Sequence, residues 1–440
     1  MVPTCHSLQL KALAANNKLI TRETMMSFYT SLTGLNAAAA ELAIASNNIA
    51  NSSTTSFKRS NANFGDIFAM SASSNMATAM GGGVQLVGVD QQFSQGGLEL
   101  TDNALDIAIS GDGFFPIQTK DGTDLYTRNG SFMLNEDDLV VNSAGHILQV
   151  HPLNANGESD FNQNLQGLTL NRTVAAQATT AITLDIKLPE SAAVIGTAGD
   201  TAIDPDDATS YNETQSLTLY DDAGEPYTAT IYYQKIGDDV VNGAITEDQW
   251  RASIYVEGED AAVGGFDVNF DANGVATVAI ADQILAASPV NGRTQAVTIG
   301  LNAVTHTKAF EIANQTVDGL PQGDLVNINV QEDGAVMAIY SNGSQITAGR
   351  INLANFTSPK GLTQQGNTIY GASNASGELT FGEPGTTGVG KLAGGAKERS
   401  NVDLTDELVR LIAAQRNFQS NAKALETSGT LTSTLINMRG

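Results

Sequence analysis

Cysteine is nearly absent from this 440-residue chain, which carries a single thiol at Cys5. One cysteine cannot form an intrachain disulfide, and it cannot build a thiolate cage for a metal ion. The sequence also lacks any run of about 18 apolar residues, so no segment is expected to cross a membrane as a helix. These absences exclude disulfide-stabilised scaffolds, cysteine-ligated zinc domains and helical membrane proteins.

Charged residues are also scarce, at 16% of the chain, and they are unevenly distributed. Residues 101–350 contain 9 lysines and arginines against 35 aspartates and glutamates, a net charge of −26. The remaining residues contain 13 basic and 12 acidic side chains, a net charge of +1. An acidic middle segment repels nucleic acid and anionic membranes, so neither is expected as a partner.

Residues 1–25 differ in character from the rest of the chain. They lack the continuous apolar stretch of a secretory signal. A strong pattern begins only after Met25 and Met26. We therefore expect translation to start at one of these methionines, with residues 1–25 a leader or a start-site artefact.

Both ends of the chain show the apolar periodicity of a helix, with alternating steps of four and three residues that form a heptad stripe. Two narrow stripes so far apart in the sequence predict helices that pack against each other or against neighbouring subunits. The alternative is two ordinary core helices of one globule. The first stripe consists of Phe28, Leu32, Leu35, Ala39, Leu42 and Ile49. The second includes Leu404, Leu408, Leu411, Phe418, Ala422 and Leu425.

The middle of the chain has the pattern of short strands and turns. Glycine reaches about 10% of the residues, against about 7% in average proteins. Strand-like runs flank turn signals such as Asp121-Gly122, a typical hairpin sequence. The sequence therefore predicts antiparallel β structure with helices only at the ends. Two glycine-containing stretches, 71–83 and 382–395, are expected to be flexible linkers.

The middle segment offers no catalytic or metal-binding constellation. His146 and His151 are five residues apart, so on a strand they would point to opposite faces, and no cysteine accompanies them. Asp271-Ala-Asn-Gly resembles the start of a calcium loop, but it lacks the glutamate at the twelfth position. A hairpin turn explains this segment better. The chain is therefore expected to have no enzymatic activity, no cofactor and no metal site.

Four segments, in order along the chain, resemble the bacterial flagellar rod, hook and hook-associated proteins. In the first, a helix ends on Asn-Asn-Ile-Ala-Asn (47–51) and is followed by Phe57 and Lys58. Many members of the family carry glycine before this phenylalanine, where the present chain has Ser56. The four segments are SFYTSLTGLNAAAAELAIASNNIANSSTTSFKRS (27–60), LDIAISGDGFF (105–115), YTRNGSF (126–132) and the carboxy-terminal segment from Ser400.

The resemblance implies a mainly β fold inserted between terminal coiled-coil-like helices. The length of the chain favours the hook branch of the family over the shorter rod proteins. The implied domains are a helical tube domain of residues 26–50 and 396–440, an arm of residues 51–95, a discontinuous inner β domain of residues 96–180 and 310–395, and an outer β domain of residues 181–309.

The resemblance further implies that the terminal segments form the interface between subunits. The asparagines would cap the helix and make hydrogen bonds between subunits, and the apolar residues would bury surface in the helical seam. The implied interface residues are Leu32, Leu35, Leu42, Asn47, Asn48, Ile49, Asn51, Phe57, Leu408, Leu411, Phe418 and Leu425.

The implied function is structural: a self-assembling, curved and flexible tube that transmits motor torque from rod to filament. The implied partners are other copies of the chain, a hook cap, the distal rod protein, the hook–filament junction protein and the flagellar type III export apparatus. The implied location is the flagellum, outside the cell after export. A distal rod or junction subunit is an alternative within the family, and a surface adhesin with a helical stalk is an alternative from another class.

Overall fold

The computed structural model describes residues 5–67, 81–154, 157–195, 203–241, 244–259, 261–271, 274–276, 282–287, 296–307 and 309–437. Within these residues, helix α1 (Cys5–Ala50) comes first and helix α2 (Leu404–Asn437) last, and the described elements between them are strands and a short 3₁₀ helix (Pro359–Gly361). The predicted fold class, mainly β with terminal helices, is confirmed. No helix in the described part of the chain is long and apolar enough to cross a membrane.

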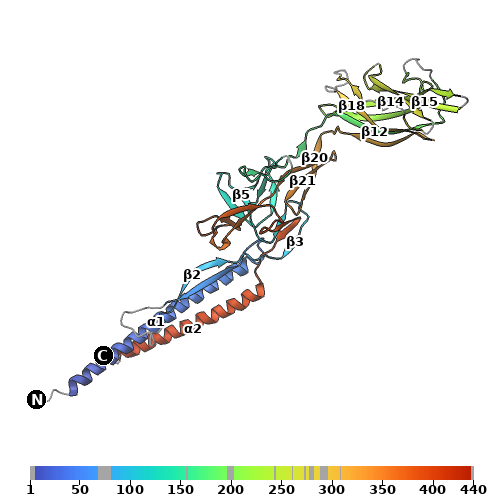
Figure 1. Cartoon of the computed structure of the whole chain (residues 1–440). Coiled ribbons are helices and arrows are strands. Elements are labelled where there is room, and N and C mark those ends of the chain that lie inside the picture. The colour runs from blue at the N-terminus through green and yellow to red at the C-terminus, as the bar shows by residue number, and fades with distance from the viewer. Residues whose placement is uncertain are drawn as a thin grey trace. The chain divides into compact units, whose positions relative to one another are not determined.

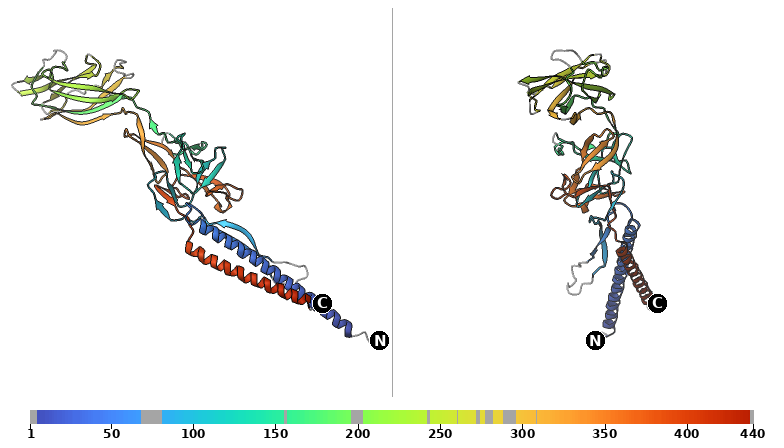
Figure 2. Two further views of the ribbon diagram at one scale, coloured as in Figure 1. Left: turned by 180° about the vertical axis from the view of Figure 1, so that it is seen from behind. Right: turned by 90° about the vertical axis from the view of Figure 1, so that its right-hand side faces the viewer.

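The two terminal helices lie side by side, although their sequences are more than 350 residues apart (Figures 1 and 2). They approach closely through small side chains, and a Cβ atom added to Gly34 would lie 2.8 Å from Oδ1 of Asn421. Helix α2 begins at Asp403, whose carboxylate accepts hydrogen bonds from the backbone N–H groups of Thr405 and Asp406. The buried small residues of the pair are Ser31, Ala38, Ala45, Ala414 and Ser428.

A β-hairpin follows α1 and packs against it. Strand β1 (Ser60–Asp66) pairs antiparallel with β2 (Val84–Gln91), with a register shift between Asn63 and Phe64. We refer to these two strands as the arm hairpin. Most of the predicted linker at 71–83 lies outside the described residues, so this prediction is tested only at its last three residues.

The chain divides into two compact units, and each has its own strands. Unit 1 contains residues 1–170, 328–337 and 347–440, and unit 2 contains residues 171–327 and 338–346. The predicted limits of the outer β domain, 181–309, fall inside unit 2.

Unit 1 contains the helices, the arm hairpin and an eight-stranded sheet of order β24-β25-β6-β5-β9-β8-β7, with β10 added beside β9. Late strands pair with early ones: β27 with β4, and β28 with β3. The strand pairing of unit 1 is therefore complete only when both ends of the chain are in place. Its strands are β3 (Leu98–Leu100), β4 (Ile107–Ser110), β5 (Phe115–Gln118), β6 (Asp124–Thr127), β7 (Phe132–Leu134), β8 (Val140–Asn142), β9 (Ile147–Val150), β10 (Gln166–Gly167), β23 (Leu353–Phe356), β24 (Thr363–Gly366), β25 (Ile369–Gly371), β26 (Leu379–Gly382), β27 (Lys391–Gly394) and β28 (Ala396–Glu398).

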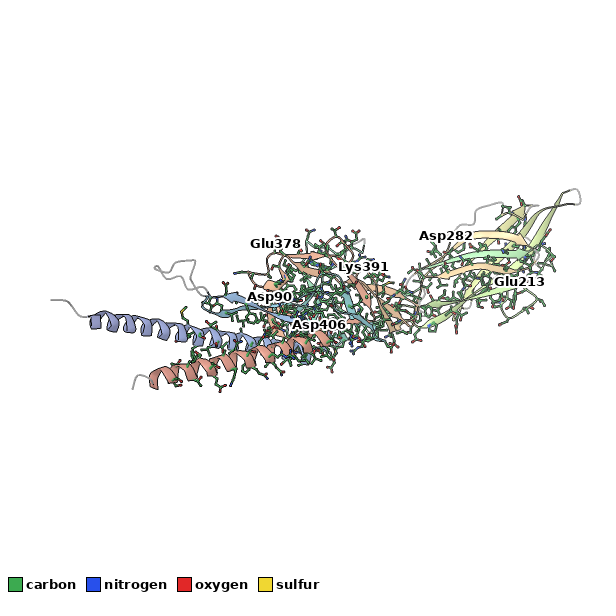
Figure 3. All side chains as sticks on the ribbon, turned by 90° about the horizontal axis from the view of Figure 1, so that it is seen from below. Asp90, Glu213, Asp282, Glu378, Lys391 and Asp406 are labelled. Carbon is green, nitrogen blue, oxygen red and sulfur yellow. The ribbon has the colours of Figure 1, made fainter. Side chains whose placement is uncertain are left out.

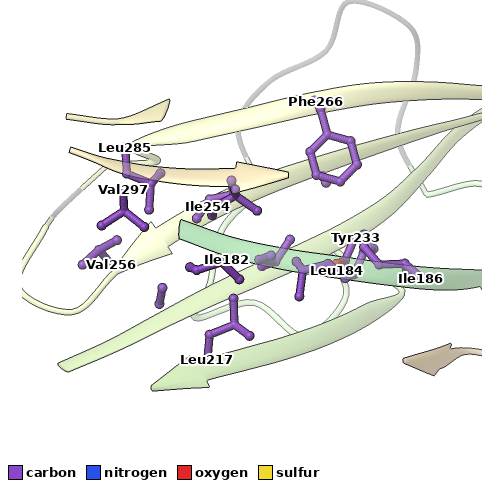
Figure 4. Close-up of a cluster of buried hydrophobic side chains, with 14 of the residues drawn as sticks. Ile182, Leu184, Ile186, Leu217, Tyr233, Ile254, Val256, Phe266, Leu285 and Val297 are labelled. Atoms are coloured by element: carbon purple, nitrogen blue, oxygen red, sulfur yellow. The ribbon is translucent and has the colours of Figure 1, made fainter. Parts of the chain in front are cut away.

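Unit 2 contains two four-stranded sheets that share one hydrophobic core, of which Figure 4 shows a part. The first sheet has the order β13-β14-β15-β16 and the second β17-β18-β12-β19. Trp250, the only tryptophan of the chain, is buried in this core. The strands are β11 (Thr173–Val174), β12 (Ala181–Pro189), β13 (Glu213–Tyr220), β14 (Pro226–Val241), β15 (Ala244–Val256), β16 (Gly264–Asp271), β17 (Gln283–Leu285), β18 (Val297–Thr307) and β19 (Glu311–Val317).

A further sheet has the order β11-β20-β21-β22, with β20 (Gly323–Val330), β21 (Ala335–Tyr340) and β22 (Gln345–Arg350).

Of two predictions about the strands, one is confirmed and the other is wrong. The Asp121-Gly122 turn joins β5 to β6 as predicted, and Gly122 adopts a φ of 83°. The prediction of purely antiparallel sheets is wrong for β12, which pairs in parallel with β18. A parallel pair needs a long crossover connection, and here the whole β13–β16 sheet lies between the two strands in the sequence.

The glycine-rich run 382–395 was expected to be a flexible linker, and this prediction is wrong. Its last part forms β27, and its glycines admit close contacts with other backbone segments. A Cβ atom at Gly390 would lie 2.6 Å from the carbonyl oxygen of Ser110, and one at Gly394 would lie 2.8 Å from that of Val330. Glycine is needed here because only a residue without a Cβ atom fits.

Alkaline pH is expected to destabilise unit 1 through Tyr126, whose burial raises the pKa of its hydroxyl to about 12 from an ordinary value of 10.0. Because the unfolded chain loses this proton first, the stability contributed by the neutral hydroxyl is complete below about pH 10 and is lost between about pH 10 and 12. One proton corresponds to about 1.4 kcal/mol per pH unit. Urea unfolding at pH 9 and pH 11 should show a smaller loss of stability for Tyr126→Phe than for the wild-type chain. An equal loss in both proteins would contradict this assignment.

Candidate functional site

The polar segment after α1 ends the helix through its own side chains. The backbone N–H of Asn51 donates to the carbonyl oxygen of Asn47 at 3.1 Å, and its side-chain Nδ2 donates to the same oxygen at 3.0 Å. Thr54 Oγ1 donates to Asn51 Oδ1 at 3.1 Å. Asn51 therefore acts as a cap within its own chain, because it satisfies a carbonyl group that the helix leaves free.

Ser56 is fully buried and adopts a left-handed backbone conformation, with a φ of 55°. Its backbone N–H donates to the carbonyl oxygen of Glu398 at 2.8 Å, and its Oγ donates to that of Arg128 at 3.0 Å. A left-handed conformation favours glycine, which many family members have before the phenylalanine. In this chain, hydrogen bonds hold a serine in the same conformation.

A buried charge cluster lies directly after Ser56. The Oε1 of Glu398 is 2.7 Å from Nζ of Lys58 and accepts a hydrogen bond from the N–H of Gly96 at 2.8 Å. The Oε2 of Glu398 accepts a bond from Nε of Arg128 at 3.2 Å. The three charged side chains are at most 2% exposed. One carboxylate thus serves two buried cations that come from distant parts of the sequence.

Backbone carbonyl groups accept further hydrogen bonds from the two cations. Lys58 Nζ donates to the carbonyl oxygen of Ser94 at 2.8 Å, and Arg128 donates to those of Gly113 and Gly111 at 3.0 and 2.8 Å. Burial, together with the nearby guanidinium of Arg128, lowers the pKa of Lys58. Burial of the ammonium is therefore costly, and Glu398 offsets part of that cost.

A second carboxylate, Glu407 in the first turn of α2, connects the two helices. It is 1% exposed, and its Oε1 lies 2.6 Å from Nε of Arg59. Asn48 in the last turn of α1 donates to Oε2 of Glu407 at 3.3 Å, and its side chain exchanges two hydrogen bonds with the backbone of Ser60. A carboxylate at this position also favours the N-terminus of α2 electrostatically. Figure 3 labels the neighbouring Asp406 at the start of this helix.

Asn401 completes the connection between the helices and the strands. Its Oδ1 accepts a bond from the N–H of Arg59 at 2.8 Å, and its Nδ2 donates to the carbonyl oxygens of Gln92 and Ser94. We define the junction as the set of residues that ties the two helices to the strands of unit 1. Its members are Asn48, Ser56, Lys58, Arg59, Arg128, Glu398, Asn401 and Glu407.

The predicted interface residues occupy three environments within one chain. Phe57 and Asn48 are buried, Asn47 and Leu408 are exposed, and the others are half-buried. Asn48 and Asn51 make the intrachain bonds described above. The half-buried residues are Leu32, Leu35, Leu42, Ile49, Asn51, Leu411, Phe418 and Leu425.

The seam between α1 and α2 is rotated from the predicted stripes. Positions 35, 42 and 49 and positions 411, 418 and 425 are half-buried within one chain. The other half of each heptad seam is formed by small residues one position earlier than predicted, so several large side chains of α2 remain outside it. Leu404, Leu408, Val409, Ile412 and Leu431 are 45–62% exposed.

The charged members of the junction were not identified as site residues from the sequence. Lys58 and Arg128 lie in two of the recognised segments, and Glu398 lies two residues before a third. The sequence feature that could have identified them is a charged residue in or beside a recognised segment of a chain that has few charges. The sequence alone does not pair them, because more than 30 carboxylates compete for each cation.

No cluster of three or more His, Cys, Asp or Glu side chains in the described part of the chain could hold a metal ion. His151 is buried between the rings of Phe161 and Phe381, and its Nδ1 donates to Asn352 Oδ1 at 3.2 Å. A cavity of about 250 Å³ beside the junction is lined by three phenylalanine rings, by Asp112 and Asn355, and by Arg128, whose guanidinium is bonded to Glu398 and to the carbonyl oxygen of Gly113.

Three family models match segments of the chain. Residues 28–58 match "Flagella basal body rod protein", residues 108–206 match "Flagellar hook protein FlgE/F/G D1 domain", and residues 393–438 match "Flagellar basal body rod FlgEFG protein C-terminal". The first and third matches contain most of the junction. The class of the protein is therefore that of the structural subunits of the flagellar rod and hook.

Comparison with curated proteins narrows the class. Flagellar hook protein FlgE of Salmonella typhimurium is 35% identical over 426 residues, which is 94% of this chain and 100% of that protein. The FlgE proteins of Escherichia coli K12 and Treponema pallidum are 34% and 28% identical, and each match covers 94% of this chain and all of the relative. The chain belongs to the flagellar hook protein family. The crystal structure of Helicobacter pylori hook protein FlgE2 is 14% identical with a TM-score of 0.47, covering 67% of this chain and 98% of that one.

Glu398→Gln is expected to destabilise unit 1 by about 3–5 kcal/mol, because it leaves two buried cations without a counter-charge. Hydrogen exchange measured by mass spectrometry should become faster at β4 and β28. The urea midpoint followed by Trp250 fluorescence should not change, because the core around Trp250 is made by unit 2. Glu378→Gln, at an exposed carboxylate, is the matched control. Unchanged exchange at both strands would contradict the role of Glu398.

Ser56→Gly is expected to be less destabilising than Ser56→Ala. Both variants lose the hydrogen bond to Arg128, but only alanine keeps the Cβ atom that makes the left-handed conformation costly. The difference should reach up to about 1 kcal/mol, because the entropy of glycine in the unfolded chain offsets part of the gain. Thermal unfolding of the two variants measures it, and a more stable Ser56→Ala would show that the backbone is not strained.

Proposed function

We propose that this hook-family subunit polymerises through its terminal helices into a tube. The observation that carries the proposal is the apolar surface that α2 leaves uncovered within one chain, where Leu404, Leu408 and Ile412 are 45–49% exposed. Large apolar side chains repeated along a helix bury their surface at roughly 25 cal/mol per Å² when a neighbour covers them. Copies of the same chain supply that neighbour in a helical polymer.

The helix pair would form the inner wall of this tube. Within a chain, small residues form half of the seam between α1 and α2, so several larger side chains of α2 remain available to other copies. The predicted interface residues then divide into two groups. Asn48, Asn51 and Phe57 hold the end of α1 in place, whereas Leu408 and its neighbours along α2 contact other subunits.

The junction would carry load between the helices and the strands. Its two carboxylates are at most 2% exposed and have cationic nitrogens 2.6–3.2 Å away, so it has few alternative arrangements of similar energy. The glycine-rich run 382–395 cannot supply compliance, because it is packed between strands. We therefore assign compliance to contacts between the β domains of neighbouring subunits, with unit 2 as the outer domain and the strands of unit 1 as the inner domain.

The partners and location follow from this role. The tube would join the distal rod protein to the hook–filament junction protein, and a hook cap would assist its growth. The subunits would leave the cell through the flagellar type III apparatus and would stand outside it. The role requires no cofactor and no catalysis, and the junction explains the buried charges without either.

Leu408→Gln is expected to reduce polymerisation of the purified chain while leaving its stability within about 0.5 kcal/mol of wild type. Glutamine keeps the helix propensity and the length of the side chain but cannot bury apolar surface. Sedimentation and negative-stain electron microscopy measure polymer, and thermal unfolding measures stability. Met133→Gln, at an exposed apolar residue of β7, is the control and should polymerise normally. Normal tubes from Leu408→Gln would contradict the assignment of this face.

A further inference from the structure

A β-bulge gives the arm hairpin one apolar face. Phe64 pairs with Leu86, and Ala62 pairs with Val89, because the register shift leaves Val87 without a partner in β1. Leu86 and Val89 are three residues apart and would point to opposite faces of a regular strand. The extra residue at the bulge brings both to the face that carries Phe64.

The apolar face of the hairpin is open and ends on a carboxylate. Phe64, Leu86 and Val89 are 39–48% exposed. Asp66 lies two residues beyond Phe64 on the same strand, so its exposed side chain points to the same face. The described residues of the hairpin, 60–67 and 81–91, contain two acidic residues, Asp66 and Asp90, and no basic residue. Figure 3 labels Asp90 on this hairpin.

Helix α2 carries a surface of the complementary kind. Leu404, Leu408, Ile412 and Arg416 follow each other at intervals of four residues, so they form one row along the helix. Residues 408–425 contain three basic and no acidic side chains. Arg416 is exposed and forms no ion pair with any residue that the structure describes. The row therefore runs from three apolar side chains to a free guanidinium.

The two surfaces match in length as well as in charge. The row from Leu404 to Arg416 spans about 18 Å at 1.5 Å per residue. The hairpin face from Ala62 to Asp66 spans about 13 Å at 3.3 Å per residue. Within one chain, Arg410 of α2 already donates to Asn61, which is on the other face of the hairpin from Phe64. The apolar face thus remains open for another molecule.

We infer that the apolar face of the arm hairpin of one copy docks on the α2 row of a neighbouring copy, with Asp66 paired to Arg416 of that copy. A contact between two unlike surfaces of the same chain is heterologous, so it repeats from copy to copy and builds an open-ended helical polymer. The inference rests on the proposed function and deepens it, because it names the surface of a neighbouring copy that covers the exposed face of α2.

Charge reversal tests this contact with the full-length purified chain. Asp66→Arg places two cations at the contact, and Arg416→Asp places two carboxylates there. Each variant alone should yield at least ten-fold less sedimentable polymer than wild type. Asp121→Arg and Lys120→Asp, at exposed residues of the β5–β6 turn, make the same changes in net charge and should polymerise normally. Thermal unfolding should be unchanged in all four variants.

Mixing distinguishes a contact between copies from one within a chain. In an equal mixture of Asp66→Arg and Arg416→Asp chains, every contact between unlike chains is an opposite-charge pair, so the mixture should form tubes that contain both. The doubly reversed chain D66R/R416D should also polymerise. Tubes from either single variant at the wild-type yield would overturn the inference while leaving the proposed function intact. Rescue in the doubly reversed chain but not in the mixture would place the pair within one chain and would also overturn it. A wild-type chain that forms no polymer under any condition would overturn both.

Discussion

The structure of unit 1 depends on a single buried carboxylate. Glu398 lies between Lys58, just after the first helix, and Arg128 at the end of β6, and none of the three is more than 2% exposed. Two buried cations without this partner would be strongly unfavourable, so the amino-terminal and central segments require the carboxy-terminal one. The same requirement is visible in the strands, because β27 and β28 pair with β4 and β3. A tube subunit with its ends tied together in this way transmits force without a loose connection.

Buried polar contacts and small side chains also determine how the two helices pack. Glu407, Arg59 and Asn48 fix where α1 ends and where α2 begins, and small residues then allow the helices to approach closely. Larger side chains in the seam would have kept the apolar surface inside one chain. The use of alanine, serine and glycine in half of the seam leaves Leu404, Leu408 and Ile412 exposed within one chain. In the proposed tube, the stability of a single chain and its capacity to assemble would therefore be supplied by different faces of the same helices.

Periodicity and turn chemistry predicted much of this fold. The heptad stripes predicted both helices, and Asp121-Gly122 predicted the hairpin turn that joins β5 to β6. The parallel pairing of β12 with β18 could not be foreseen, since a strand sequence does not specify its neighbour. The glycine run 382–395 was misread because glycine serves both flexible linkers and close backbone contacts, and only the neighbouring strands distinguish the two. Recognition of the family segments found Lys58, but the pairing of Lys58 with Glu398 is a contact over 340 residues that local pattern cannot reveal.

The central claim is that copies of this chain form a tube with the helix pair inside and the junction intact. Cryo-electron microscopy of tubes grown from the purified chain tests it most directly. The account predicts α1 and α2 in the inner layer, density between Lys58 and Glu398 in every subunit, and the Leu404–Ile412 face of α2 covered by other subunits. A tube in which these helices lie outside the wall, or in which Lys58 is separated from Glu398, would contradict it.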